Sequence, residues 1–153
     1  MFRRTRKENE EFYENLRKYG FSPEKPWFYV SAALTNAPNA EALREFYERI
    51  ANIIAAHGGF CYLPQRVTDP VKHAIGIFPV DVYEIDMKAI KMCKNGGAMI
   101  AVLEVQSFGV GAEIQKAFSE GVRLIYLIPV KTKVSRLVKG GGENIRRATE
   151  KMI

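Results

Sequence analysis

The sequence predicts a doubly wound α/β domain with a mostly parallel sheet of about five strands flanked by helices, similar to flavodoxin-like and Rossmann-like folds. Short, nearly continuous apolar segments alternate with amphipathic segments of helical spacing, which is typical of a parallel sheet covered on both faces. The length of 153 residues suits one such domain. Hydrophobic residues at 47% and charged residues at 26% are sufficient for a buried core and a polar surface.

Residues 1–26 are predicted to form an accessory helix and linker, and residues 27–153 a single α/β domain. A narrow apolar stripe predicts a helix over residues 5–19, and Gly20 is a suitable end for it. The stripe consists of Phe12, Leu16 and Tyr19. Two prolines in the segment 21–26 then favour a linker.

The main domain is predicted to alternate strands and helices. Apolar runs predict strands over residues 27–34, 60–63, 98–105 and 124–130. Helical spacing predicts helices from Asn39 to Gly58, over 81–94 and over 112–120, and a short basic helix over 143–152 after the glycines 140–142. The segment 64–80 is predicted to be a loop, long enough to indicate a function. Ligands of this fold class bind where the strands end.

Composition excludes several functional classes. No apolar run approaches the roughly 18 residues that cross a bilayer, so we expect a cytoplasmic protein without a membrane partner. The net charge of +6 is concentrated in residues 130–153, which carry seven Lys or Arg and two Glu. No aromatic residue is interleaved with these charges, so nucleic acid is not an expected partner. Two Cys and two His are too few for a metal site of workable spacing.

The most informative segment is Glu104–Glu113, with the sequence EVQSFGVGAE, which places two glycines between a strand and a helix. It matches neither the Walker phosphate loop nor the dinucleotide fingerprint. If the helix begins at Ala112, Glu113 lies in its first turn, where the helix dipole favours an ionised carboxylate suited to a nucleophile. The alternative is an ordinary glutamate that complements the helix dipole.

Asp86 is the second candidate acid. In a helix over 81–94 it shares a face with the apolar positions Ala89, Ile90 and Cys93, so it is expected on the buried side. Burial raises the pKa of a carboxyl and keeps its proton available. A paired structural acid is the alternative. Two carboxyls with pKa values pushed apart are the usual arrangement for cleaving a glycosidic bond.

Four segments, taken in order, resemble the nucleoside 2-deoxyribosyltransferase superfamily, and in particular its nucleotide N-glycosidase branch. The resemblance spans about residues 28–140. The segments are Tyr29–Ala33, Asp86–Ile90, Ser107–Glu113 and Ser135–Gly140. The third of them, SFGVGAE, is the most specific.

The resemblance implies roles for individual residues. Glu113 would be the nucleophile that takes the sugar, Asp86 would assist departure of the base, and Tyr29 would orient the nucleophile. Ser107, Gly109 and Gly111 would face the 5′ end of the substrate, and Ser135 would reach the phosphate from the neighbouring subunit of a homodimer. Ser31, Thr35 and Gln65 complete the positions expected to contact the substrate.

The expected activity is therefore cleavage of the N-glycosidic bond of a nucleoside or nucleoside 5′-monophosphate through a glutamyl-glycosyl intermediate. Water as acceptor gives hydrolysis, and a second base gives transfer. No cofactor or metal is required by this scheme. Residues 32–35, AALT, lack the serine and arginine that the nucleotide hydrolases usually carry there. The alternative is therefore a nucleotide-binding or sensing module of the same fold without turnover.

Overall fold

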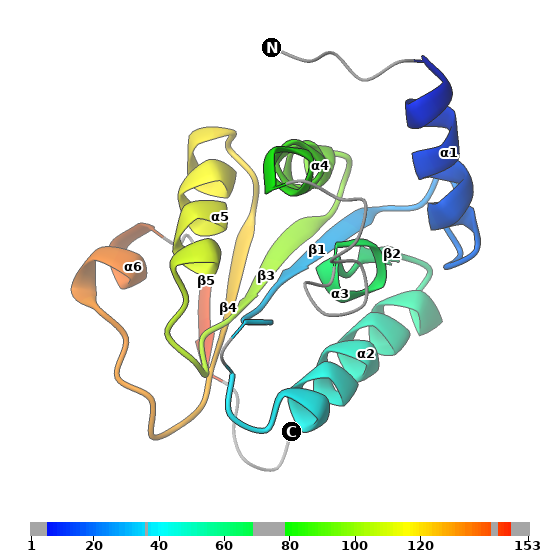
Figure 1. Ribbon diagram of the computed structural model, residues 1–153. Coiled ribbons are helices and arrows are strands. Elements are labelled where there is room, and N and C mark those ends of the chain that lie inside the picture. The colour runs from blue at the N-terminus through cyan, green and yellow to red at the C-terminus, as the bar shows by residue number, and fades with distance from the viewer. Residues whose placement is uncertain (1–5, 36, 69–78, 142–143, 148–153) are drawn as a thin grey trace.

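Five parallel strands form the centre of the molecule, in the spatial order β2-β1-β3-β4-β5 (Figure 1). The computed structural model describes residues 6–35, 37–68, 79–141 and 144–147. The strands are β1 Trp27–Ser31, β2 Phe60–Tyr62, β3 Ala98–Val102, β4 Leu124–Ile128 and β5 Asn144–Arg147. The predicted α/β class, with its parallel sheet of about five strands, is confirmed.

Six helices of the described residues connect and cover these strands. They are α1 Arg6–Arg17, α2 Ala40–Ala56, α3 Pro64–Val67, α4 Pro79–Met92, α5 Phe108–Ser119 and α6 Arg136–Gly141. Helix α3 lies in the segment predicted to be a loop, and the rest of that loop, residues 69–78, falls outside the described residues. Pro64 at the first helical position favours the start of α3, because proline lacks only an N–H that has no partner there.

Two buried clusters lie on opposite faces of the sheet. Alternate residues of a strand point to opposite faces, so Tyr29 belongs to the cluster with α4 and α5, whereas Val30 belongs to the cluster with α2. Figure 1 shows α4 and α5 on one side of the strands and α2 on the other. The site described below lies on the α4 and α5 face, at the carboxyl ends of β1 and β2.

Helix α1 contributes to the same core as α4 and α5. Phe12 and Leu16 are 6% and 1% exposed and pack in that cluster. Tyr19, the third residue of the predicted stripe, is exposed on one side, and the guanidinium of Arg66 lies 4.8 Å from the centroid of its ring. The N-terminal helix is therefore joined to the domain through the burial of Phe12 and Leu16 in its core.

Two predicted features at the C-terminal end are wrong. Residues 144–147 form strand β5, which pairs in parallel with β4, rather than part of a helix over 143–152. β3 pairs with one side of β4 only, so the backbone N–H and C=O groups on the other side are available to hydrogen-bond a further strand. The glycines 140–142 are predicted to precede that helix as a joint, but the first two of them belong to helix α6. Residues 142, 143 and 148–153 lie outside the described residues.

Gly97 permits the close approach of β1 and the start of β3. A Cβ atom at this position would lie 1.7 Å from the carbonyl oxygen of Trp27. No side chain fits at that distance, so only glycine allows the two backbones to approach in this way. The register that follows places Tyr29 beside Met99 in the sheet.

Candidate active site

Glu113 is held by two hydroxyl groups of strand β1. The Tyr29 hydroxyl donates a hydrogen bond to Glu113 Oε1 at 2.7 Å, and the Ser31 hydroxyl donates a hydrogen bond to Glu113 Oε2. Tyr29 and Ser31 are two positions apart on one strand, so both side chains point to the same face. Both donors are buried, with no measurable exposure. Each carboxylate oxygen of Glu113 therefore has its own donor.

The predicted reason for the ionisation of Glu113 is wrong. Helix α5 begins at Phe108, one turn earlier than expected, after Ser107 as N-cap, whose hydroxyl accepts a hydrogen bond from the Val110 amide at 3.4 Å. Glu113 lies in the second turn, where the effect of the helix dipole is small. Burial raises the pKa of Glu113, and the hydrogen bonds from Ser31 and Tyr29 oppose that rise. The two hydroxyls, rather than the helix start, favour the charged form.

Asp86 is buried on helix α4, as its helical spacing predicts. Its exposed fraction is 6%, and Ala89 and Ile90 beside it have no measurable exposure. The Tyr62 hydroxyl donates a hydrogen bond to Asp86 Oδ1 at 3.0 Å. Burial first, and then the charge of Glu113, raise the pKa of Asp86 to about 7, while the Tyr62 hydrogen bond lowers it. Asp86 can therefore hold a proton near neutral pH.

The two acids belong to one electrostatic cluster. The negative charge of Glu113 raises the pKa of Asp86, and burial followed by the charges of both acids raises the pKa of Tyr29 well above its ordinary value. Within the part of the chain that the structure describes, Glu113 has two hydroxyl donors and Asp86 has one. Because hydrogen bonds from donors stabilise the ionised form, Glu113 ionises first and its charge keeps the proton on Asp86. The arrangement provides a carboxylate beside a carboxylic acid.

Tyr62 is a site residue that the sequence analysis missed. It is the last residue of β2 and lies beside Tyr29 in the parallel register. The two rings are stacked, with centroids 5.3 Å apart and an interplanar angle of 14°. The feature of the sequence that could have indicated Tyr62 is a tyrosine at the carboxyl end of a predicted strand. Its partner on α4 is 24 residues away in the chain, so no local spacing indicates the contact.

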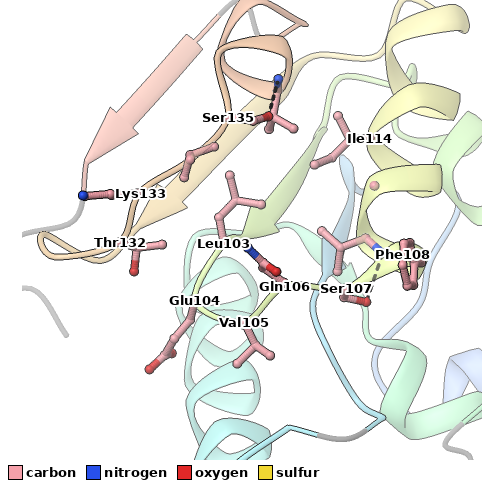
Figure 2. Close-up of a pocket in the computed structure, with 14 residues that line it drawn as sticks. Leu103, Glu104, Val105, Gln106, Ser107, Phe108, Ile114, Thr132, Lys133 and Ser135 are labelled. Atoms are coloured by element: carbon pink, nitrogen blue, oxygen red, sulfur yellow. Dashed lines mark hydrogen bonds between the residues drawn. The ribbon is translucent and has the colours of Figure 1, made fainter.

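Three predicted substrate-contacting residues line a pocket that lies on a different side of α5 from the Glu113 carboxylate. Ser107, Gly111 and Ser135 line a cavity of about 420 Å³ between the segment after β3 and the segment after β4 (Figure 2). Val110 and Ile114 of α5 also line it, whereas the Glu113 carboxylate turns to β1. The structure thus brings the serines of two distant segments together within one chain.

The remaining predicted residues lie elsewhere. Gly109 is exposed in the first turn of α5, and Thr35 is exposed after β1. Gln65 is buried, and its amide nitrogen donates hydrogen bonds to the Arg44 carbonyl at 3.2 Å and to Glu48 Oε1 at 2.8 Å. The Gln65 amide therefore holds α3 against α2.

Neither a metal centre nor a membrane span is found among the residues that the structure describes. Within residues 6–35, 37–68, 79–141 and 144–147, no three His, Cys, Asp or Glu side chains gather in a way that could hold a metal ion. The helices in the same ranges are too short or too polar to cross a bilayer.

Two solved structures with the same fold are enzymes, an N-glycosidase and a 2-deoxyribosyltransferase. One is the CMP N-glycosidase BcmB of Clostridium botulinum, with a TM-score of 0.57 and 22% identity over 79% of this chain and 87% of that chain. Another is a 2-deoxyribosyltransferase of Bacillus psychrosaccharolyticus, with a TM-score of 0.63 and 14% identity over 79% of this chain and 85% of that chain.

No protein-family model matches the sequence, and no curated protein is similar to it. The likeness to solved structures therefore lies in the fold, and it covers about four-fifths of the chain. This chain therefore shares its fold with a CMP N-glycosidase and a 2-deoxyribosyltransferase.

Proposed function

We propose that this protein cleaves the N-glycosidic bond of a nucleoside or nucleoside 5′-monophosphate. The observation that carries the proposal is the pair of electrostatically coupled carboxyls, Glu113 and Asp86, each with its own tyrosine donor. One carboxylate and one neutral carboxylic acid at the same site are the groups that retaining glycosidases use. The fold shared with an N-glycosidase and a deoxyribosyltransferase supports the same reaction class.

The proposed reaction has two steps. Ionised Glu113 attacks the anomeric carbon and forms a glycosyl ester, while the carbon–nitrogen bond breaks and its electron pair goes to the base. Asp86 gives its proton to the departing base. In the second step the Asp86 carboxylate takes a proton from water, and the oxygen of that water attacks the anomeric carbon and releases Glu113. A second base in place of water gives transfer.

The 5′ end of the substrate is proposed to lie at the start of α5. Ser107, Gly109 and Gly111 occupy the first turn and its cap, where backbone N–H groups attract anions. A monophosphate suits this place, and the CMP N-glycosidase of the same fold acts on one. Lys133 lines the same pocket as Ser107 and Gly111 and adds positive charge.

A homodimer is part of the proposal, with Ser135 reaching the site of the neighbouring subunit. Its support is apolar surface at the two helix starts that border the pocket. Phe108 is fully exposed in the single chain, and Leu137 is 87% exposed. A partner that covers these two side chains would remove their apolar surface from water.

Incubation with a panel of nucleosides and 5′-monophosphates, followed by chromatography for free base, tests the proposal. Glu113→Gln should abolish base release, because an amide is a poor nucleophile. Glu120→Gln is the matched control: Glu120 ends the same helix in an ion pair with Lys116 at 2.5 Å and should leave release unchanged.

Two outcomes would contradict the proposed activity. Base release that persists in Glu113→Gln would exclude Glu113 as the nucleophile. Nucleotides that raise the melting temperature of the wild type without any base release would instead indicate a binding or sensing module, since a ligand that binds only the folded state stabilises it.

A further inference from the structure

Tyr62 places its hydroxyl on one oxygen of Asp86 and leaves the other oxygen for the reaction. Tyr62 is 1% exposed, and its hydroxyl lies 3.0 Å from Asp86 Oδ1. A neutral carboxylic acid carries one proton, and an oxygen that accepts a hydrogen bond from a donor favours the proton on its partner oxygen. The proton of Asp86 is therefore directed to Oδ2.

We propose that Tyr62 is a positioning residue for the acid of the reaction, which fixes the Asp86 carboxyl and assigns its transferable proton to Oδ2. This inference rests on the proposed function, because it concerns the same acid. It adds a residue outside the four segments on which the resemblance is based. Tyr62 touches Asp86 rather than the reacting atoms, so its role is exerted through Asp86.

The Tyr62 ring is held firmly enough to define where its hydroxyl lies. It stacks on two aromatic residues of β1, with centroids 5.3 Å from Tyr29 and 5.9 Å from Trp27. Phe12 of α1 packs on it as well, with centroids 6.4 Å apart. A ring packed by three aromatic neighbours has little freedom to rotate. The N-terminal helix thus contributes to the geometry of the acid.

The charged and titratable groups around Asp86 come from each element packed on α4. Glu113 lies on α5, Tyr29 on β1 and Tyr62 on β2. The Lys88 side chain of α4 points to α1, where its ammonium lies 5.8 Å and 5.0 Å from the ring centroids of Phe12 and Tyr13. Among the described residues, Tyr62 is the side chain that donates a hydrogen bond to Asp86.

Tyr62→Phe tests the inference, because it removes the hydroxyl and keeps the stacked ring. A hydrogen bond from Tyr62 favours the ionised carboxylate, so its loss should raise the pKa of Asp86 by about one pH unit. Carbon-13 NMR of the aspartate carboxyl groups, titrated with pH, measures this directly and needs no activity. The alkaline limb of the kcat/KM profile, which reports the acid, should move upward with it.

Tyr126→Phe is the matched control. Tyr126 is a fully buried tyrosine of β4 in the same core cluster, and its hydroxyl has no hydrogen-bond partner among the described residues. Its replacement should move neither the Asp86 titration nor the alkaline limb. We expect kcat to fall about tenfold in Tyr62→Phe, the loss of one charged hydrogen bond, and to stay unchanged in Tyr126→Phe.

The two measurements separate this inference from the proposed function. An unchanged Asp86 titration in Tyr62→Phe would overturn the role of Tyr62, whatever the activity. A kcat that falls equally at every pH, with the limb unmoved, would also overturn it by indicating a merely structural role. A wild type that releases no base from any substrate would overturn the proposed function, even if the Asp86 titration shifts as expected.

Discussion

Tyr29 and Tyr62 lie side by side on neighbouring parallel strands, and each donates a hydrogen bond to a different carboxyl. Tyr29 supports Glu113 and Tyr62 supports Asp86, while the two rings stack at 5.3 Å. The parallel register of β1 and β2 pairs the two tyrosines directly. The sheet therefore sets the distance between the two tyrosines that donate hydrogen bonds to the acids. Helix α4 brings Asp86 to Tyr62, and helix α5 brings Glu113 to Tyr29.

Tyr29→Phe should move the acidic limb of the kcat/KM profile to higher pH. The Tyr29 hydrogen bond opposes the rise in the pKa of Glu113, so its loss raises that pKa further. A smaller fraction of the nucleophile is then ionised at neutral pH, and kcat/KM at pH 6 should fall roughly tenfold. The measurement is base release between pH 4 and 9. A shift of the alkaline limb alone would contradict the assignment of Tyr29 to Glu113.

Asp86→Asn should make the protein more stable at alkaline pH. The pKa of Asp86 is raised from an ordinary 3.8 to about 7, so the unfolded chain loses this proton first as the pH rises. The stability that the protonated group provides is complete below about pH 4, declines between about pH 4 and 7, and is absent above that interval. This shift in pKa corresponds to a loss of roughly 4 kcal/mol at most in the free energy of unfolding as the pH rises. The raised pKa of Glu113 also lowers the stability with rising pH.

Urea denaturation at pH 4, 6 and 8 measures this effect. The gain in the free energy of unfolding of Asp86→Asn over the wild type should grow from pH 4 to pH 8. Glu14→Gln, on the exposed side of α1, controls for the loss of one negative charge. A gain that is the same at all three pH values would show that Asp86 titrates normally in the folded protein.

Leu16→Ala tests how strongly α1 belongs to the domain. Leu16 is 1% exposed within the core cluster that includes Trp27 and Ile90, so truncation should lower the free energy of unfolding by about 3 kcal/mol. Ile53→Ala is the control: Ile53 is 61% exposed on α2 and should change stability by less than about 0.5 kcal/mol. If Leu16→Ala is neutral, residues 1–26 act as the separate accessory segment that the sequence predicts.

Phe108→Ser combined with Leu137→Ser should convert the proposed dimer into monomers. Both side chains are almost entirely exposed in the single chain, and their removal takes away the apolar surface at the starts of α5 and α6. Phe118→Ser, at the other end of α5 and 55% exposed, is the control. Analytical ultracentrifugation measures the change, and a monomeric wild type would exclude the dimer.

The sequence alone predicted the fold class because apolar strands and amphipathic helices alternate clearly from Trp27 to Ile128. It failed at β5, because the segment NIRR has no apolar run and its strand conformation comes from pairing with β4. The start of α5 was placed one turn late, because two glycines hide the beginning of that helix. Local signals therefore determine most elements, and tertiary pairing determines the rest.

The candidate acids were accessible to sequence reasoning, whereas their supports were not. Helical spacing indicated that Asp86 is buried, and a specific motif indicated Glu113. The donor on Asp86 comes from Tyr62, and that contact exists only because β1 and β2 pair in one register. The pKa of Glu113 depends on burial between β1 and α5, which no spacing along one helix reveals.

Strand β1 lies inside the sheet, with β2 on one side and β3 on the other. Both donors to Glu113 are therefore on a strand that cannot separate from the sheet without breaking two ladders of backbone hydrogen bonds. Local openings of a folded protein begin at its ends and edges. Transient fraying at β5 or α6 would then leave the nucleophile in place, so Glu113 and its two donors should be among the last parts of the molecule to lose their arrangement during such fluctuations. Tyr62, the donor to Asp86, lies on the edge strand β2, so the acid should lose its support before the nucleophile does.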